Sequence, residues 1–306
     1  MITSFVQLIC GQSTFARVMV SCFTLLGLFS VSSGVVAQTS VWKVSKDGSD
    51  VYIGGTVHLL RQQDFPLPAP FADAYDQSDR LFFETDIGAM SDMGLQQRML
   101  QELTYQDGRS LSTVLDAESF AALSEYLSTS GLPVAMVQTF KPGLLISTLS
   151  VLEFQKLGFT PQGVDAYFYN RALGEGKPRG QLESIDEQIA MLASMGEGYE
   201  SEFVLYSIRD FKDLPNAIER MLTAWRDGDV DSLYAEFVVP MLAQAPDLYD
   251  SLLVRRNNNW IPQIEGMFDQ EGTEFVLVGA AHLVGEHGVV QQLEARGYTV
   301  TQLGLE

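Results

Sequence analysis

Apolar and polar positions follow two different periods along this chain of 306 residues. Near the amino end, VWKVSK alternates, DGSD supplies a turn and VYIGGTV is a more apolar run, which predicts a β-hairpin over residues 41–57. LFFETDI, residues 81–87, predicts a further strand because it is rich in Phe and Ile. The carboxyl end returns to this pattern, with strands EFVLVGA and YTVTQLG flanking the helical VVQQLEARG. Strands are therefore expected at both ends of the chain.

Residues from about 94 to 270 instead place apolar side chains every three to four positions, as amphipathic helices do. KPRGQLES, residues 177–184, interrupts this pattern and predicts a short strand that leads directly into a helix. Ser184 and Glu187 form an S-x-x-E capping box at the start of that helix. The sequence predicts a mixed α/β (α+β) fold in a single domain, residues 38–306. Its central sheet is built from N- and C-terminal strands, and a largely helical middle region packs around it.

The first 37 residues differ from the rest of the chain. Arg17 is their only charged residue, a long apolar stretch follows it, and the small-residue sequence VVA ends at Ala37, ahead of Gln38. This pattern predicts a signal peptide, residues 1–37, cleaved near Ala37/Gln38; the alternative is a membrane anchor, which the Ser and Gly residues of the stretch disfavour. We therefore expect a periplasmic or secreted protein, with no stable membrane span after cleavage.

The positions of the two cysteines and the net charge exclude several classes of function. Both cysteines lie in the leader, so the mature chain has no thiol nucleophile, no Cys-ligated zinc and no disulfide scaffold. The formal net charge of the whole chain is −20. Such a surface repels nucleic acid and anionic lipid and attracts cations. We expect no nucleic-acid partner.

Two of the three histidines share one arrangement: each follows a glycine by three positions, directly after a strand-like apolar run. They are His58 in GTVH and His282 in GAAH. A strand that ends in a Gly-containing loop exposes the next side chains at a fixed place. If the two strands are neighbours, the imidazoles meet and form one divalent-metal or catalytic site; otherwise each is a structural histidine. His287, in the polar loop GEHG, is interpreted as a surface residue.

Carboxylates at other strand ends are candidates to complete such a site. Glu84 and Asp86, in FFETD, have period-two spacing and would face the same side of a strand. An acidic pair that closes an apolar strand needs either a partner or exposure at a solvated strand end. Glu183 closes the QLES strand immediately before a helix. Both positions therefore combine a strand terminus with a carboxylate.

Three further polar residues have two interpretations each. Arg256 with Asn257, in RRNNNW, would stabilise an oxyanion or pair with one of the carboxylates; alternatively, the stretch is a polar helix start. Asp165, in GFTPQGVDAYF, is placed where a helix N-terminus favours a negative charge, so it needs no functional role.

With these residues identified, the sequence resembles the TraB/GumN family (TraB/PrgY/GumN), the bacterial relatives of the Tiki metalloproteases. The resemblance implies that His58, His282 and Glu84 are metal ligands and that Glu84, Glu183 and Arg256 are catalytic residues. One small departure is Thr85, where the family more often has an apolar residue. The resemblance covers essentially the whole mature chain through the segments VWKVSKDGSDVYIGGTVHLL, RLFFETD, KLGFTPQGVDAYF, KPRGQLESIDEQIAML, AWRDGD, LLVRRNNNW and VLVGAAHLVGEHGVVQQLEARGYTV.

The activity implied by the resemblance is that of a metal-dependent, peptidase-like hydrolase, acting on a peptide or small-molecule substrate. The ion would be Mn²⁺ or Co²⁺, with Zn²⁺ as a further choice, because imidazole and carboxylate suit such ions and an open coordination position activates water. The wider fold group also includes erythromycin-esterase-like enzymes and haem-binding lipoproteins, and a shared fold does not fix the chemistry. A second hypothesis is therefore a non-catalytic protein that binds a peptide signal or haem in the same cleft.

Overall fold

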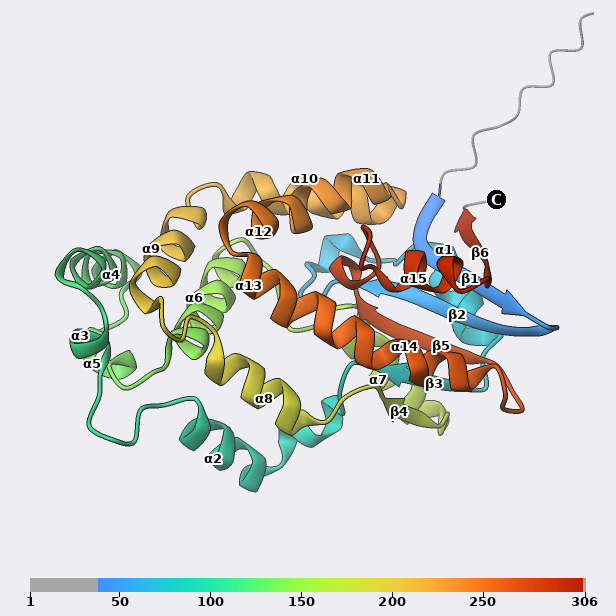
Figure 1. Ribbon diagram of the computed structural model, residues 1–306, viewed down its shortest axis with the longest axis horizontal. Helices are drawn as coiled ribbons and strands as arrows, with labels where there is room; N and C mark the ends of the chain where they lie inside the picture. Colours follow the sequence, from blue (N-terminus) through green and yellow to red (C-terminus); the bar gives the residue numbers. More distant parts are fainter. Residues whose placement is uncertain (1–37, 305–306) are drawn as a thin grey trace, which may run out of the picture. The chain divides into compact units, whose positions relative to one another are not determined.

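The computed structural model describes residues 38–304, which belong to one structural unit (Figure 1). The signal peptide predicted for residues 1–37 and its cleavage site lie outside the described residues. No helix within the described part of the chain has the length and apolar character needed to cross a bilayer.

Six strands form one mixed sheet in the order β4-β3-β5-β2-β1-β6. β1 and β2 make the predicted hairpin, and Asp47 and Gly48 between them have φ of 52° and 91°, as a tight two-residue turn requires. β2 pairs with β5, β5 with β3 and β3 with β4, all in parallel, so these four neighbouring strands end at the same edge of the sheet. The strands are β1 (Gln38–Lys46), β2 (Ser49–Thr56), β3 (Arg80–Phe83), β4 (Arg179–Gln181), β5 (Glu274–Gly279) and β6 (Thr299–Gly304).

The helices account for most of the middle of the chain. Short 3-10 or π-helical turns, labelled η, join several of them; those used below are η2 (Ile87–Ser91), η3 (Tyr234–Val238), η4 (Asp250–Val254) and η5 (Ala280–His282). The α-helices are α1 (Ala69–Asp76), α2 (Met93–Glu102), α3 (Leu111–Val114), α4 (Ala117–Ser130), α5 (Val134–Val137), α6 (Pro142–Lys156), α7 (Val164–Glu175), α8 (Ile185–Ser194), α9 (Glu200–Asp210), α10 (Leu214–Asp227), α11 (Val230–Leu233), α12 (Val239–Gln244), α13 (Pro246–Tyr249), α14 (Arg255–Met267) and α15 (Val289–Ala295).

The apolar strand β5 has a hydrophobic core on each of its faces. Phe275 and Leu277 pack with side chains of α1, α7 and α10, whereas Val276 and Val278 pack with side chains of α14 and α15. Side chains of a strand alternate between the two faces, so an uninterrupted apolar run is what a strand covered on both sides needs. A third core joins α3, α4, α5, α6 and α9, which lie together to one side of the sheet (Figure 1). The predicted mixed α/β fold, with helices packed around a central sheet, is confirmed.

The structure corrects two of the predicted strands and one pairing. The strand predicted over residues 81–87 ends at Phe83, and the one predicted over 177–184 is only β4. Asp86 therefore does not share a strand face with Glu84: it is exposed, and its carboxylate accepts a hydrogen bond from the Gly88 N–H at 2.9 Å, which caps η2. An Asp that follows a strand readily forms such a local cap. The strand therefore stops at Phe83, and its alternation of faces does not extend to Asp86.

Candidate functional site

Four predicted site residues lie just beyond the ends of the four parallel strands. His58 follows β2, Glu84 follows β3, Glu183 follows β4 and His282 lies in η5 after β5. β2 and β5 are neighbours, with Thr56 opposite Gly279, so the two G-x-x-H loops leave the sheet side by side. The carboxyl ends of parallel strands are where α/β proteins commonly bind ligands, because loops there meet above the sheet edge.

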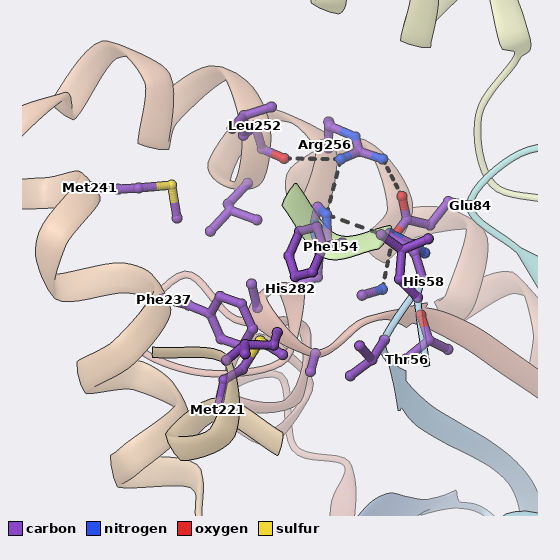
Figure 2. A pocket seen from close by; sticks show the side chains of 17 residues that line it. Thr56, His58, Glu84, Phe154, Met221, Phe237, Met241, Leu252, Arg256 and His282 are labelled. Carbon is purple, nitrogen blue, oxygen red and sulfur yellow. Dashed lines mark hydrogen bonds and ion pairs between the residues drawn. The ribbon is translucent and has the colours of Figure 1, made fainter. Parts of the chain in front are cut away.

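Three of these side chains converge above Gly279. A Cβ atom added at Gly279 would lie 3.2 Å from Glu84 Oε1, 3.5 Å from His282 Cδ2 and 3.8 Å from His58 Nε2. The Glu84 carboxylate accepts a hydrogen bond from the Gly279 N–H at 2.7 Å, and the same oxygen lies 3.9 Å from His282 Nε2. Figure 2 shows His58, Glu84 and His282 at one end of a cavity. Glycine at this position thus leaves room for all three groups.

His58 is oriented by Asp165. His58 Nδ1 lies 2.8 Å from Asp165 Oδ2, and Asp165 lies in the first turn of α7. That helix begins close to the His58 backbone, because a Cβ added at Gly163 would lie only 2.2 Å from the His58 carbonyl carbon. The negative charge of Asp165 raises the pKa of His58 to about 9, against the opposing effect of desolvation. Asp165 therefore does more than stabilise the helix N-terminus: it holds and charges the His58 ring.

Replacing Asp165 with asparagine should lower the pKa of His58 from about 9 toward its ordinary value near 6.5. A folded-state pKa above the unfolded value means that the pair stabilises the fold fully below about pH 6.5 and loses this contribution as the pH rises through about 9. Asp165→Asn should lack this pH dependence. NMR titration of the metal-free protein measures the pKa, with the exposed His287 ring as an internal control. An unchanged His58 titration in Asp165→Asn would contradict the assignment.

His282 is held in a different way, by a neutral partner. His282 Nδ1 lies 2.6 Å from Asn257 Oδ1. The Asn257 amide N–H groups donate to the carbonyl oxygens of His282 at 3.1 Å and His287 at 2.8 Å, so its Oδ1 is the acceptor and His282 Nδ1 carries the proton. The ring packs against Trp260 at 4.4 Å between ring centroids, and burial lowers the pKa of His282 to about 3. The ring is therefore neutral, with its Nε2 lone pair toward the cluster.

Arg256, at the start of α14, links the cluster together (Figure 2). Its Nη2 donates to Glu84 Oε2 and to Glu183 Oε1, both at 2.6 Å, and its Nε donates to Glu183 Oε2 at 3.0 Å. Nη1 donates to the Leu252 carbonyl at 3.2 Å and lies 3.0 Å from His282 Nε2. An arginine side chain has five N–H donors, and each has an acceptor here. Arg256 pairs with two carboxylates, as one of the hypotheses expected, and it does not lie at a free helix start, because η4 continues directly into α14.

The electrostatic environment keeps Glu84 ionised. Burial alone would raise the pKa of Glu84, but His282, Arg256 and His58, together with the Gly279 N–H, lower it to about 2. Glu183 lies beside the same guanidinium and also accepts hydrogen bonds from Trp260 Nε1 at 3.2 Å and Gln188 Nε2 at 2.9 Å. Two buried carboxylates are thus compensated largely by one arginine.

A cavity of about 340 Å³ opens from this charged cluster. Its charged end is formed by His58, Glu84, Arg256 and His282, and the rest of its wall is almost entirely apolar. A second hollow of about 250 Å³ shares His58 and Glu84 but is otherwise lined by residues that include Asp165 and Gln188. The apolar side chains that line the first, 340 Å³ cavity come from α6, α10, η3, α12 and η4. They include Phe154, Ile218, Met221, Phe237, Met241 and Leu252.

Sequence reasoning missed these apolar wall residues. All but Phe154 lie between residues 218 and 252, and a Met or Phe at helical spacing has the same pattern whether it faces a core or a cavity. Phe237 and Leu252 belong to the π-helical segments η3 and η4. π-Helical turns are rare and occur frequently at functional sites. Their geometry is the one local signal for this wall, and it is visible only in the structure.

The site fits a divalent metal ion by its donor types but not by its arrangement. Its donor types, two imidazole nitrogens and a carboxylate, suit Mn²⁺, Co²⁺ or Zn²⁺. Their arrangement does not, because Arg256 occupies the acceptor atoms His282 Nε2 and Glu84 Oε2. Within residues 38–304, no group of three or more His, Cys, Asp or Glu side chains is arranged to hold a metal ion. A metal ion and Arg256 in this position therefore exclude each other.

The fold and the cluster together define an α/β protein with a charged cluster and a cavity at the carboxyl ends of parallel strands. The particular family follows from comparison with known proteins. The model of the TraB/PrgY/gumN family matches residues 40–302, and the chain belongs to this family. Searches of curated proteins and of solved structures found no match.

Proposed function

We propose that this member of the TraB/PrgY/gumN family is a hydrolase that cleaves an amide or ester bond in a peptide or small molecule. The observation that carries this proposal is the meeting of His58, His282 and Glu84 above Gly279, at the charged end of an otherwise apolar cavity. Pairs of titratable groups whose environments push their pKa values apart are typical of acid–base catalysis. His58 and His282 are such a pair, with pKa values of about 9 and about 3.

The side chains have distinct roles in this proposal. His58 is charged at neutral pH, so it donates its Nε2 proton to the leaving group, and the proton that the attacking water releases then returns to His58; Asp165 holds the ring in place. The ionised Glu84 orients the attacking water by accepting a hydrogen bond, and Glu183 holds Arg256. Dependence on Mn²⁺ or Co²⁺, with His58, His282 and Glu84 as ligands, remains part of the proposal and requires Arg256 to move.

The apolar wall supports a substrate that carries a large apolar group beside the bond to be cleaved. Ligand pockets of this size are mostly apolar, with a few polar groups that fix orientation. Met241→Glu places a charge on this wall, at a half-buried position. We expect it to weaken substrate binding by roughly 10-fold or more, from the lost burial of a Met-sized group. The change in KM for wild type and Met241→Glu measures this effect.

Met93→Glu is the matched control for that comparison, since Met93 is 82% exposed on α2 and does not line the cavity. It should leave KM unchanged. Equal KM values for Met241→Glu and wild type would show that the substrate does not use the apolar wall.

A second candidate function is favoured by one observation. Because each N–H donor of Arg256 already has an acceptor, the guanidinium offers no spare donor to an oxyanion in this arrangement. The cavity would then serve a non-catalytic protein that binds a peptide signal or haem. Purified protein, tested for turnover of peptides and esters and for binding of the same compounds, separates the two. Product formation supports the hydrolase, and binding without product supports the alternative.

We also propose export to the periplasm or beyond the cell, on the signal-peptide pattern of residues 1–37 alone. N-terminal sequencing of the protein from its native host tests this proposal. A first residue near Gln38 supports export, and an intact leader on cytoplasmic protein contradicts it.

A further inference from the structure

We propose that Arg256 is the resident cation of this site and that a divalent metal ion binds only when the Arg256 guanidinium withdraws. This inference rests on the proposed metal ligands His58, His282 and Glu84. It adds a regulatory element, because the chain itself would control whether the site accepts an ion. The observation behind it is that Arg256 is bonded to two of the three proposed ligands.

The two buried carboxylates of the site require a nearby positive charge. The side chains of Glu84 and Glu183 are only 10% and 7% exposed, and buried carboxylates are strongly unfavourable without a nearby positive charge. Arg256 lies within 2.6 Å of an oxygen of each. A divalent ion at the same acceptors would supply positive charge as well. Arginine and metal ion thus satisfy one electrostatic need, and only one of them can use the same lone pairs.

Glu183 can retain the Arg256 guanidinium when it withdraws from the other two residues. Arg256 contacts Glu183 through both Nε and Nη2, the two-point geometry in which arginine binds a carboxylate most firmly. Glu183 is itself fixed by Trp260 and Gln188. Arg256 also lines the cavity, so open space lies beside it. The guanidinium can release His282 and Glu84 by turning about its Nε–Glu183 hydrogen bond and giving up the Nη2 contact, which makes Glu183 a positioning residue for Arg256.

The wild-type chain should therefore bind an ion more weakly than His58, His282 and Glu84 would in the absence of Arg256. Part of the binding free energy is used to displace Arg256 from His282 Nε2 and Glu84 Oε2. Removing the guanidinium should expose the full affinity of the donors. It should also leave the fold dependent on the ion, since the metal would replace the missing positive charge.

The experiment compares wild type with Arg256→Met and with Arg255→Met. Arg255 is the adjacent residue on the same helix, but its side chain is 66% exposed and pairs with Asp250, so it serves as the matched control. Titration calorimetry with Mn²⁺ and with Co²⁺ measures affinity, and thermal unfolding with and without the ion measures linkage. We expect Arg256→Met to bind at least about tenfold more tightly than wild type and to gain more thermal stability from the ion. Arg255→Met should behave like wild type.

Two further variants keep the test decisive. Arg256→Lys retains a positive charge but has only three donors on a compact ammonium, so it cannot hold all the acceptors of a guanidinium. It should bind the ion with intermediate affinity, and it serves if Arg256→Met does not fold without metal. His282→Ala combined with the Arg256 variant should remove the gain, which assigns the binding to this site.

The outcomes separate this inference from the proposed function. Tighter ion binding by Arg256→Met than by wild type supports the inference, whereas a wild type that binds no ion counts against the metal dependence in the proposed function. Equal affinity in both overturns the inference and leaves the proposed metal dependence standing. Absence of ion binding in both Arg256 variants overturns the inference as well, whatever the hydrolytic activity of the wild type.

Discussion

Replacing His58 or His282 with alanine is expected to reduce hydrolysis by about 10²- to 10⁴-fold, the usual contribution of a positioned acid–base group. The two histidines should fail for different reasons. His58→Ala removes the ring that Asp165 holds toward the cavity, and with it the proton at Nε2. His282→Ala removes a buried neutral ring that fixes Arg256 and faces Glu84. The measurement is kcat/KM for a substrate that the wild type turns over.

The control for this comparison is His287→Ala. The His287 ring is exposed, and the contact it makes with the site is through its backbone carbonyl, which alanine keeps. This variant should retain wild-type activity, and all three should be checked for folding by circular dichroism. Equal activity in His58→Ala and His287→Ala would remove His58 from the mechanism. Turnover lost only together with folding in His282→Ala would reduce His282 to a structural residue.

The sequence predicted that the two histidines could meet, because the strand and loop that carry each of them have a recognisable local pattern. GGTVH and VGAAH each combine an apolar run, a glycine and a histidine, and these specify a strand followed by an exposed loop. What the sequence does not contain is the pairing of β2 with β5, which joins segments more than two hundred positions apart. The prediction was therefore conditional on neighbouring strands, and the structure meets that condition.

The partners of the two histidines were not predictable in the same way. Asp165 was already explained by its place at a helix N-terminus, and Asn257 by a polar helix start. The local explanation holds for Asp165, which lies in the first turn of α7. It is wrong for Asn257, because η4 continues directly into α14 and Asn257 lies inside a continuous helical run. Their second role arises from tertiary packing, which brings α7 to His58 and α14 to His282. Asp86 shows the reverse error, since a spacing that suggested function belongs to a local cap.

The difference between Asp165 and Asn257 as partners gives the site its asymmetry. The carboxylate of Asp165 favours the charged form of the exposed His58, and burial beside the neutral amide of Asn257 favours the neutral form of His282. Two similar sequence motifs therefore produce two different imidazoles. The asymmetry supports a division of roles, with proton exchange at His58 and a fixed neutral nitrogen at His282.

Glu84→Gln is expected to destabilise the metal-free protein at neutral pH by on the order of 3 kcal/mol, the free-energy equivalent of a pKa lowered from 4.5 to about 2. The side chain keeps its shape but no longer offers a negative charge to Arg256. Because the folded-state pKa lies below the unfolded value, the stabilisation by Glu84 is fully present above about pH 4.5 and is lost as the pH falls through about 2. The variant should lack this dependence.

Urea unfolding of both proteins between about pH 7 and about pH 3, with a chelator present, measures this difference. The stability of the wild type should approach that of Glu84→Gln as the solution becomes more acidic, because below about pH 4.5 Glu84 is protonated in the unfolded chain but must lose that proton to fold. Glu286→Gln, at an exposed position in the loop after η5, removes the same charge from the surface and should leave stability within about 0.5 kcal/mol of wild type. A constant gap between wild type and Glu84→Gln at every pH would instead mean that shape and packing, rather than the Glu84–Arg256 charge pair, hold the cluster together.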